Sequence, residues 1–517
     1  MRSVSRRQFV ADCGCVSLLS LVPRGVFVDA SKVQEFLVKT DSEIGLVRPE
    51  FHGHFAEHLG SCVYGGLWVG RNSKVPNING HRKLAVKYLR DVGVPVLRWP
   101  GGCFADDYHW RDGIGPEARR PKRVNIHWGG YVEDNSFGTH EFIELCRLIG
   151  AEPYLAGNVG SGSPSELRDW VEYCNYPAGS ALSEERIGNG AREPFKVRYW
   201  GVGNESWGCG GDMKPEEYAA LYRRFAVYLK EFGGTAPFLI ASGPSRADVR
   251  WSRGVLDNLR GELPDGLSMH YYEGGKQEPT KFDVLHMTEQ LRIFKDVEEA
   301  ICLQRAVLDG YPRGSKIALI LDEWGVWDQI PSEDEKRHGA LWQQSTMRSA
   351  LAAALGLNLF NRLADRLYMC NIAQIVNVLQ SLLMTEGAES EKCVRTTTYY
   401  AFALFKAHRS KTAVRVVPSE PSPEGISVSA SKGAKELVLS FVNPSADKDV
   451  VVDCTVLGGA PKAVTADMLH NPDLNAFNSF EAPDQVVIQR HTARIEKDKI
   501  RLELPRLSVA TASVELG

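Results

Sequence analysis

Two features are absent from this 517-residue chain. No uninterrupted apolar run comes close to the roughly 20 residues that a membrane-spanning helix needs. There is also no excess of positive charge, because 61 Lys and Arg stand against 64 Asp and Glu, for a net charge of −3. Binding to a phosphate backbone needs a basic surface. We therefore expect neither a membrane partner nor a nucleic-acid partner.

The chain also lacks cysteines at the spacing of a structural metal site. Of its 11 cysteines, Cys13 and Cys15 lie near the N-terminus, and the nine that follow form no CxxC pair. Nine is an odd number, so they cannot all pair with one another, and we expect most of them to be buried thiols. A Cys174–Cys209 disulfide is an alternative for one pair, because both residues lie in predicted loops at strand ends. No metal site and no cofactor is expected.

The first 30 residues have the pattern of a targeting segment. Arg6 and Arg7 precede Phe9 and a modestly apolar run that ends near Val22, and Ala30 offers a small residue for cleavage. This resembles a twin-arginine export signal. The alternative is a chance arginine pair at a disordered start. We expect a periplasmic or extracellular protein, with the cytoplasm as the alternative.

Residues 49–390 alternate short apolar strands with amphipathic helices. Six clear strand patterns, one pattern before them and one after them make eight, although the last, "MCNIAQIVNV", fits a helix equally well. Such alternation predicts a parallel sheet covered by helices, and eight strands favour a closed (β/α)8 barrel over an open sheet.

Three segments carry clear helix patterns. Residues 80–93 end at Gly93, and residues 214–234 have Pro215 in the first turn and Gly233 with Gly234 at the predicted stop. Residues 335–360 are expected to form a third helix.

The pattern changes to alternating apolar and polar residues after about residue 390. Residues 391–517 therefore predict an all-β sandwich, jelly-roll-like in shape, and the strand-like residues 31–48 are expected to complete it. No low-complexity linker separates the two parts, so we expect them to pack firmly. The tail could alternatively be a carbohydrate-binding module.

Residues 197–212, "VRYWGVGNESWGCGGD", admit two hypotheses. A dinucleotide-binding loop needs G-x-G-x-x-G, and Gly201 and Gly203 fit, but Ser206 occupies the third position. Glu205 would also repel a pyrophosphate, which such loops bind through backbone N–H groups. In a barrel, by contrast, this loop follows a strand at the end where active sites lie. The sequence therefore favours Glu205 as a catalytic carboxylate.

A second glutamate, Glu323, closes the strand "IALILDEWG" in the same way. Cleavage of a glycosidic bond needs one carboxyl that holds a proton near neutral pH and another that stays ionised. Two glutamates at one barrel mouth meet this need. Trp200 and Trp207 offer apolar walls beside them, and Asn204 could donate a hydrogen bond to a sugar hydroxyl.

Six motifs occur in the order typical of one known family. They are "GHFAEHLG", "RWPGGCFADDYHWRDGIGP", "YWGVGNESWGCGG", "MHYY", "LDEWGVW" and "AQIVNV". Together they resemble glycoside hydrolase family 51, from about residue 35 to the C-terminus. The resemblance implies a retaining (β/α)8 hydrolase with catalytic glutamates on strands four and seven. It also implies an exo-acting α-L-arabinofuranosidase that removes terminal arabinofuranosyl groups from arabinose-containing polysaccharides or oligosaccharides.

The resemblance also implies roles for single residues. Glu205 matches the acid/base and Glu323 the nucleophile, which should lie roughly 5–5.5 Å apart. The residues that match substrate-binding positions are Glu57, Asn204, His270, Tyr272 and Gln374.

Other positions are less clear from the sequence. Tyr271 is the alternative to Tyr272 for the sugar contact. His270 is expected to orient a glutamate. Arg98 and Trp200 are expected to support the site, Arg98 through a buried ion pair. Cys103 also matches a substrate-binding position, where many family members have Asn. A thiol is a poorer donor than an amide, so we expect the backbone N–H of Cys103 to bind the sugar.

The sequence leaves alternatives open. The same fold includes endo-β-1,4-glucanases and β-xylosidases, and a non-catalytic glycan-binding protein could keep the barrel. A homo-oligomer is a further possibility that family resemblance suggests.

Overall fold

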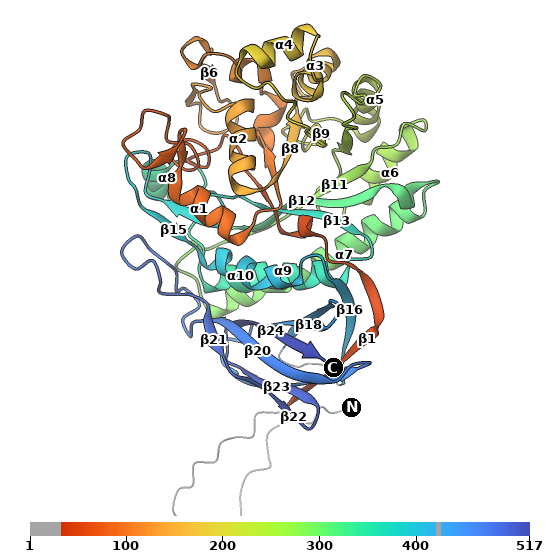
Figure 1. Cartoon of the computed structure of the whole chain (residues 1–517), viewed down its shortest axis with the longest axis vertical. Helices are drawn as coiled ribbons and strands as arrows, with labels where there is room; N and C mark the ends of the chain where they lie inside the picture. Colours follow the sequence, from red (N-terminus) through yellow and green to blue (C-terminus); the bar gives the residue numbers. More distant parts are fainter. Residues whose placement is uncertain (1–32, 420–424) are drawn as a thin grey trace, which may run out of the picture.

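Eight parallel strands close into a barrel in the computed structural model, which describes residues 33–419 and 425–517. The strands adjoin one another in chain order, so each helical connection returns the chain to the next strand (Figure 1). The barrel strands are β2 (Gly53–Phe55), β5 (Val96–Trp99), β8 (Glu152–Gly157), β9 (Tyr199–Val202), β10 (Phe238–Ala241), β11 (Gly266–Gly274), β12 (Ala318–Trp327) and β13 (Leu367–Ala373). The predicted barrel is confirmed, and its last strand is not helical.

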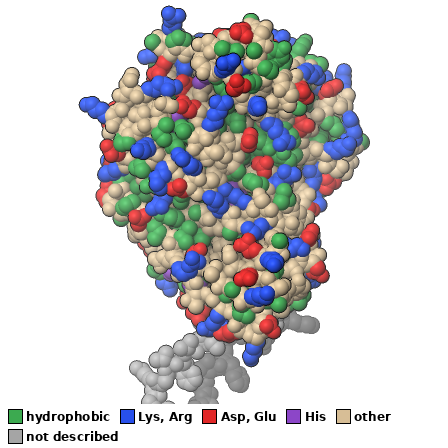
Figure 2. Space-filling view, viewed as in Figure 1, with side chains coloured by type: hydrophobic (Ala, Val, Ile, Leu, Met, Phe, Trp, Pro, Cys, Tyr) green, Lys and Arg blue, Asp and Glu red, His purple; other side chains and the backbone are tan. Residues whose placement is uncertain are grey.

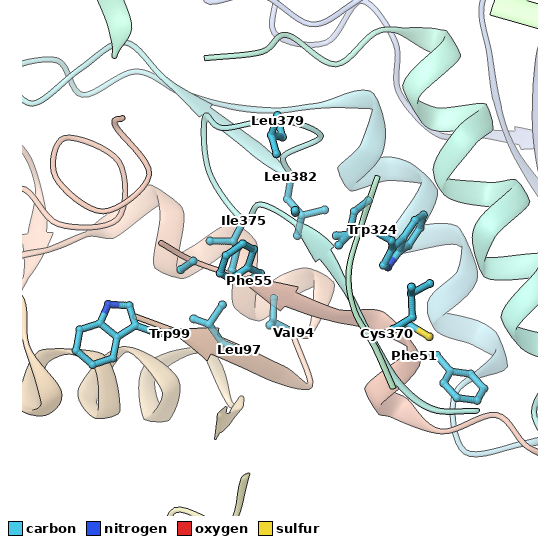
Figure 3. Packing of buried hydrophobic residues seen from close by; sticks show 14 of the residues in the cluster. Phe51, Phe55, Val94, Leu97, Trp99, Trp324, Cys370, Ile375, Leu379 and Leu382 are labelled. Carbon is cyan, nitrogen blue, oxygen red and sulfur yellow. The ribbon is translucent and has the colours of Figure 1, made fainter. Parts of the chain in front are cut away.

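Apolar side chains fill both sides of the barrel wall. Inside it, a cluster from six strands comprises Val96, Tyr154, Tyr199, Ile240, Ile320 and Met369. Outside it, Leu97 and Trp99 join the larger core beneath the helices; Figure 3 shows them with Phe55 and Ile375. Because both faces are buried, the strands carry continuous apolar runs.

Ten helices cover the barrel or connect it to the second domain within the described residues. They are α1 (Lys83–Val92), α2 (Thr139–Ile149), α3 (Pro164–Asn175), α4 (Ala181–Gly188), α5 (Pro215–Ala226), α6 (Val249–Asn258), α7 (Val284–Asp309), α8 (Ser332–His338), α9 (Met347–Arg362) and α10 (Thr397–Phe405). No helix among these residues has the length and apolar character needed to cross a membrane.

Of the three predicted helices, the first ends where the sequence predicts, the second ends earlier, and the third is divided in two. Gly93 ends α1 in the left-handed conformation at φ 71°. Helix α5, however, ends at Ala226 and not near Gly233, because the chain tightens into i→i+3 turns that still bury Leu229. The predicted helix over residues 335–360 is two helices, α8 and α9. At the start of α9 the Thr346 N–H donates to Ser349 Oγ at 3.1 Å.

The second domain is one ten-stranded sheet that curls over its own core. Its order is β21-β20-β24-β18-β17-β16-β1-β19-β23-β22, in which β1 (Gln34–Leu46) brings the N-terminal part of the described chain into the middle. The other strands are β16 (Thr412–Pro418), β17 (Ser427–Lys432), β18 (Glu436–Asn443), β19 (Val450–Leu457), β20 (Pro461–His470), β21 (Gln489–His491), β22 (Ala493–Glu496), β23 (Lys499–Leu504) and β24 (Ser508–Leu516). The predicted sheet-rich C-terminal domain is confirmed. The prediction that residues 391–517 are all-β was wrong at its start, because α10 (Thr397–Phe405) lies within that range and packs against α9.

Short elements lie outside these two sheets. They are the 3₁₀ turns η1 (Pro49–His52), η2 (Cys103–Asp106), η3 (Trp110–Gly113), η4 (Glu117–Arg119), η5 (Gly314–Lys316) and η6 (Lys406–His408), and the strand pairs β3 (Asn77–Ile78) with β4 (His81–Arg82), β6 (Arg123–Val124) with β7 (Val132–Glu133), and β14 (Leu383–Thr385) with β15 (Cys393–Arg395).

Helices α9 and α10 lie between the barrel and the curled sheet (Figure 1). The barrel core continues across this boundary, because Val442 and Val509 of the sheet belong to it. Buried Asn358 of α9 adds polar contacts: its side chain donates to Ser427 and accepts from Ser440 Oγ at 2.6 Å. On the face shown in Figure 2, acidic and basic side chains are interspersed. The twin-arginine prediction lies outside the described residues.

The Asn358→Ala variant is expected to lose about 1–3 kcal/mol of unfolding free energy, because buried Ser440 and half-buried Ser427 lose the side-chain amide that they contact. Urea unfolding followed by tryptophan fluorescence measures this loss. The exposed Asn72→Ala variant is the control. Equal midpoints for the two variants would contradict the interface role of Asn358.

Candidate active site

The glycine-rich loop after β9 holds Glu205 in a left-handed backbone conformation at φ 40°. This conformation is unfavourable for a residue with a side chain. The turn is secured by the Gly208 and Gly210 N–H groups, which donate to the Glu205 carbonyl. The Glu205 carboxylate therefore lies in this loop, where it would repel a pyrophosphate.

Glu323 lies on β12, and donors reach both of its carboxylate oxygens. Arg98 Nη1 donates to Oε1 at 2.6 Å, and Tyr272 Oη donates to Oε2 at 2.7 Å. The Glu323 side chain is 6% exposed, whereas that of Glu205 is 19% exposed. Tyr271, the other candidate phenol, instead packs beside Arg246.

His270 on β11 joins the two glutamates. Its Nδ1 lies 2.8 Å from Glu205 Oε1 and 3.5 Å from Glu323 Oε2, while Nε2 lies 2.9 Å from Asp322 Oδ1. Burial lowers the pKa of His270, but the Glu323 and Asp322 carboxylates outweigh burial and raise the pKa to about 10. The imidazolium form therefore donates from both nitrogens.

Glu57, directly after β2, lies in a buried polar corner of the site. The Phe104 N–H and Trp128 Nε1 donate to its Oε1, and Gln374 Nε2 donates to its Oε2. Burial, followed by repulsion from Glu323, raises the pKa of Glu57 to about 7. The group therefore changes charge near neutral pH.

Asn204 is fixed from two sides. Arg98 Nη2 donates to its Oδ1 at 2.5 Å, and its backbone N–H donates to Asp106 Oδ2 at 2.9 Å. Its Nδ2 is buried and has no protein acceptor, and Gln374 Oε1 likewise has no protein donor. Buried polar atoms without partners in an active site are suited to a bound ligand.

The segment "PGG" brings backbone close to both buried acids. A Cβ at Gly101 would lie 2.7 Å from Glu57 Cγ, and one at Gly102 would lie 3.1 Å from Glu323 Oε1. Glycine is therefore needed for this close approach.

The cysteine pairing differs from the predicted one. Cys209 is bonded to Cys103, with a Cα–Cα distance of 5.4 Å, and Cys174 is a buried free thiol. The Cys174–Cys209 alternative was wrong because barrel closure brings the loops after β5 and β9 together, which sequence spacing does not reveal. As part of a disulfide, Cys103 has no S–H to donate to a sugar. Six of the seven free cysteines in the described part of the chain are buried, as expected.

Three further residues near the site were not predicted from the sequence. Asp322 pairs with His270, Asp106 accepts from the Val159 and Asn204 N–H groups, and Trp128 reaches Glu57 from the β6–β7 loop. The motif "LDEW" offered a signal for Asp322, but nothing in the sequence places Trp128 there. Trp200 is buried beneath the loop and donates to the Val197 carbonyl.

The geometry defines a class of enzyme. One carboxylate oxygen each from Glu205 and Glu323 and a His270 nitrogen lie within 4.8 Å of one another. Two acids this close at the carboxyl ends of strands four and seven have the arrangement of retaining glycoside hydrolases; inverting enzymes keep roughly 6.5–9.5 Å between them.

The comparisons with known proteins agree with this class. The Alpha-L-arabinofuranosidase 1 domain family matches residues 88–290, and the Alpha-L-arabinofuranosidase C-terminal domain family matches residues 322–508. An intracellular exo-alpha-L-arabinofuranosidase of Bacteroides ovatus is 43% identical over 95% of this chain and 97% of its own.

Solved structures give the same answer. The family 51 arabinofuranosidase of Xanthomonas axonopodis pv. citri is 37% identical with a TM-score of 0.89, over 93% of this chain and 100% of its own. The alpha-L-arabinofuranosidase of Thermotoga maritima, solved with arabinose, is 30% identical with a TM-score of 0.82 over the same shares. The chain belongs to glycoside hydrolase family 51 and is a hydrolase that removes arabinofuranosyl groups. Glucanase, xylosidase and non-catalytic alternatives are not favoured.

The Glu57→Gln variant is expected to change the pH dependence of stability. Because the pKa of Glu57 is raised from 4.5 to about 7 in the fold, its contribution to stability is fully present below 4.5 and is lost as pH rises through 7. The variant lacks this loss, so its stability relative to wild type should rise by about 3 kcal/mol between pH 4.5 and pH 7. Urea unfolding at several pH values measures the difference. Exposed Glu117→Gln is the control, and a pH-independent difference for Glu57→Gln contradicts the assignment.

Proposed function

We propose that the protein is an exo-acting, retaining α-L-arabinofuranosidase with Glu323 as nucleophile and Glu205 as acid/base. The observation that carries this proposal is the proximity of the two carboxylates on either side of His270. A retaining reaction needs a carboxylate within reach of the anomeric carbon and a second carboxyl near the leaving oxygen.

The surroundings of Glu323 favour the role of nucleophile. Arg98 and Tyr272 donate to different oxygens of its carboxylate, and both interactions stabilise the charged form. The carboxylate is therefore oriented before the sugar arrives. Attack on the anomeric carbon then forms a covalent arabinosyl-enzyme.

The surroundings of Glu205 favour proton transfer. His270 holds its Oε1, while Oε2 lies toward the more open side of the site, next to Cys209. Proton donation from this carboxyl would release the leaving group. Formation of the covalent intermediate neutralises Glu323, and the now ionised Glu205 can accept a proton from water.

Four further groups provide polar contacts for one sugar ring. Asn204 Nδ2 and Gln374 Oε1 are buried without protein partners, Glu57 offers carboxylate oxygens, and Tyr272 places its phenol beside the nucleophile. We assign these groups to the hydroxyls of a terminal arabinofuranose. Arg98 fixes Asn204 through a hydrogen bond, and buried Trp200 packs under the loop that carries Asn204. Cys103 would contribute only its backbone, because its sulfur is in the disulfide.

We infer an exported protein from Arg6 and Arg7, with the cytoplasm as the alternative. The Cys103–Cys209 disulfide favours export, because disulfides are typical of oxidising compartments. The Bacteroides ovatus relative is named as intracellular, which favours the alternative. Fractionation of the producing cells distinguishes the two. A homo-oligomer stays a prediction that light scattering would test.

Hydrolysis of p-nitrophenyl α-L-arabinofuranoside, followed by NMR of the released sugar, tests the activity and its stereochemistry together. We expect the α-anomer to be released first. Initial release of the β-anomer would contradict Glu323 as nucleophile. Activity on a β-xyloside but not on the arabinoside would contradict the proposed substrate.

The Glu323→Ala and Glu205→Ala variants are expected to differ in their substrate dependence. Loss of the nucleophile should abolish turnover of every arabinoside. Loss of the acid/base should slow natural arabino-oligosaccharides by roughly 10²–10⁴-fold, but should spare the first step with a good leaving group such as p-nitrophenolate. Pre-steady-state release of p-nitrophenol measures that step. Wild-type rates for Glu205→Ala on natural arabinosides would contradict its role.

A further inference from the structure

The Cys103–Cys209 pair lies directly against Glu205. Cys209 Sγ is 3.6 Å from Glu205 Oε2, and since both sulfurs are in a disulfide this is a contact and not an S–H hydrogen bond. The two sulfur atoms and a Glu205 carboxylate oxygen all lie within 4.8 Å of one another. Two soft ligands and one carboxylate therefore converge at the barrel mouth.

From this arrangement we propose that reduction of the disulfide creates a binding site for a thiophilic divalent cation such as Zn²⁺. Its ligands are Cys103 Sγ, Cys209 Sγ and the Glu205 carboxylate. Bound metal occupies the carboxylate that transfers protons and so stops hydrolysis. The inhibitory step rests on the acid/base role of Glu205 proposed above, whereas the binding step does not.

The chemistry of the ligands suits such an ion. Thiolates select zinc and other soft metals, and zinc accepts a tetrahedral set of sulfur, nitrogen and oxygen ligands with water as the fourth. Two thiolates on one zinc ion lie about 3.8 Å apart, as follows from Zn–S distances of about 2.3 Å. The Cα–Cα distance of 5.4 Å allows this after rotation of the side chains. No movement of the barrel strands is required.

The position also allows reduction. Cys209 is exposed, and exposed disulfides are the ones that external thiols reach. A dithiol would supply two electrons, break the S–S bond and leave two S–H groups while becoming a disulfide itself. Both protons then leave when the metal binds.

The carboxylate is already oriented for this role. His270 takes Oε1 of Glu205 at 2.8 Å, so Oε2 is the oxygen that faces the sulfurs. On the other side, His270 also contacts Asp322 and Glu323 and is therefore not available as a ligand without loss of those contacts. These contacts favour the two-sulfur set over a set made of Glu205, His270 and Glu323.

The test uses the full chain with Cys13, Cys15 and Cys302 replaced by Ser, which removes the two N-terminal thiols and the exposed free thiol. A water-soluble phosphine reduces the disulfide; water provides the oxygen of the phosphine oxide and the two thiol protons. After anaerobic removal of the phosphine, Cd²⁺ is titrated as an optical stand-in for Zn²⁺, and the thiolate-to-metal absorption band is recorded. Zn²⁺ is then used for the activity measurements.

We expect about one Cd²⁺ per reduced chain and no such band for the oxidised chain. The Cys209→Ser variant should lose the band, and Glu205→Gln should bind more weakly. In the reduced background protein, one equivalent of Zn²⁺ should slow arabino-oligosaccharide hydrolysis by about 100-fold, and a chelator should restore it.

Absence of the band from the reduced background protein, or an unchanged band in Cys209→Ser, overturns the proposed site. A metal complex with the expected band but undiminished hydrolysis supports the site and instead contradicts Glu205 as acid/base. If the reduced, metal-free protein is already as slow as the metal complex, the inhibitory step is wrong.

Discussion

The buried guanidinium of Arg98 is the interaction on which the rest of the site depends. It extends from β5 and donates to Glu323 on β12 and to Asn204 after β9, so one side chain joins strands two, four and seven. Burial alone would lower the pKa of Arg98, but the Asp322 and Glu323 carboxylates outweigh it and raise the pKa. The cation is therefore permanent, and its removal would take one of the two cations that contact buried Asp322 and Glu323.

A second cation completes the charge balance. His270 is held protonated by Glu323 and Asp322. Each of these two carboxylates lies near both cations, Arg98 and His270. Arg98 and His270 hold the pKa of Asp322 below its usual range in spite of burial. The pKa of Glu57 is instead raised, because burial and then the Glu323 carboxylate oppose its charge. One site thus contains carboxyls with opposite pKa shifts because their neighbours differ.

Much of this follows from the sequence, through rules that act locally. Apolar runs that end in polar residues predict the barrel strands, and the position of Glu205 and Glu323 at strand ends predicts that they meet. The pairing of Cys103 with Cys209 could not be predicted this way, because it depends on which loops barrel closure brings together. Trp128 belongs to the long connection between β5 and α2, whose sequence has no clear helix or strand periodicity. The break between α8 and α9 was not predicted, although α8 has no apolar residue and is followed by Gly339 with φ 98°. The start of the second helix is marked by the Thr346 N–H, which donates to Ser349 Oγ.

The two catalytic candidates are anchored in different ways, and the difference matches the chemistry proposed for them. Glu323 belongs to a barrel strand, and both of its oxygens accept hydrogen bonds from fixed donors. A nucleophile benefits from this rigidity, because its attack requires one orientation. Glu205 belongs to a loop, holds one fixed contact to His270, and exposes more of its side chain. An acid/base must give a proton to a departing group and then take one from incoming water, so it needs an oxygen that solvent and leaving groups can reach. The same accessibility places that oxygen beside the Cys103–Cys209 pair, where thiol chemistry can affect it.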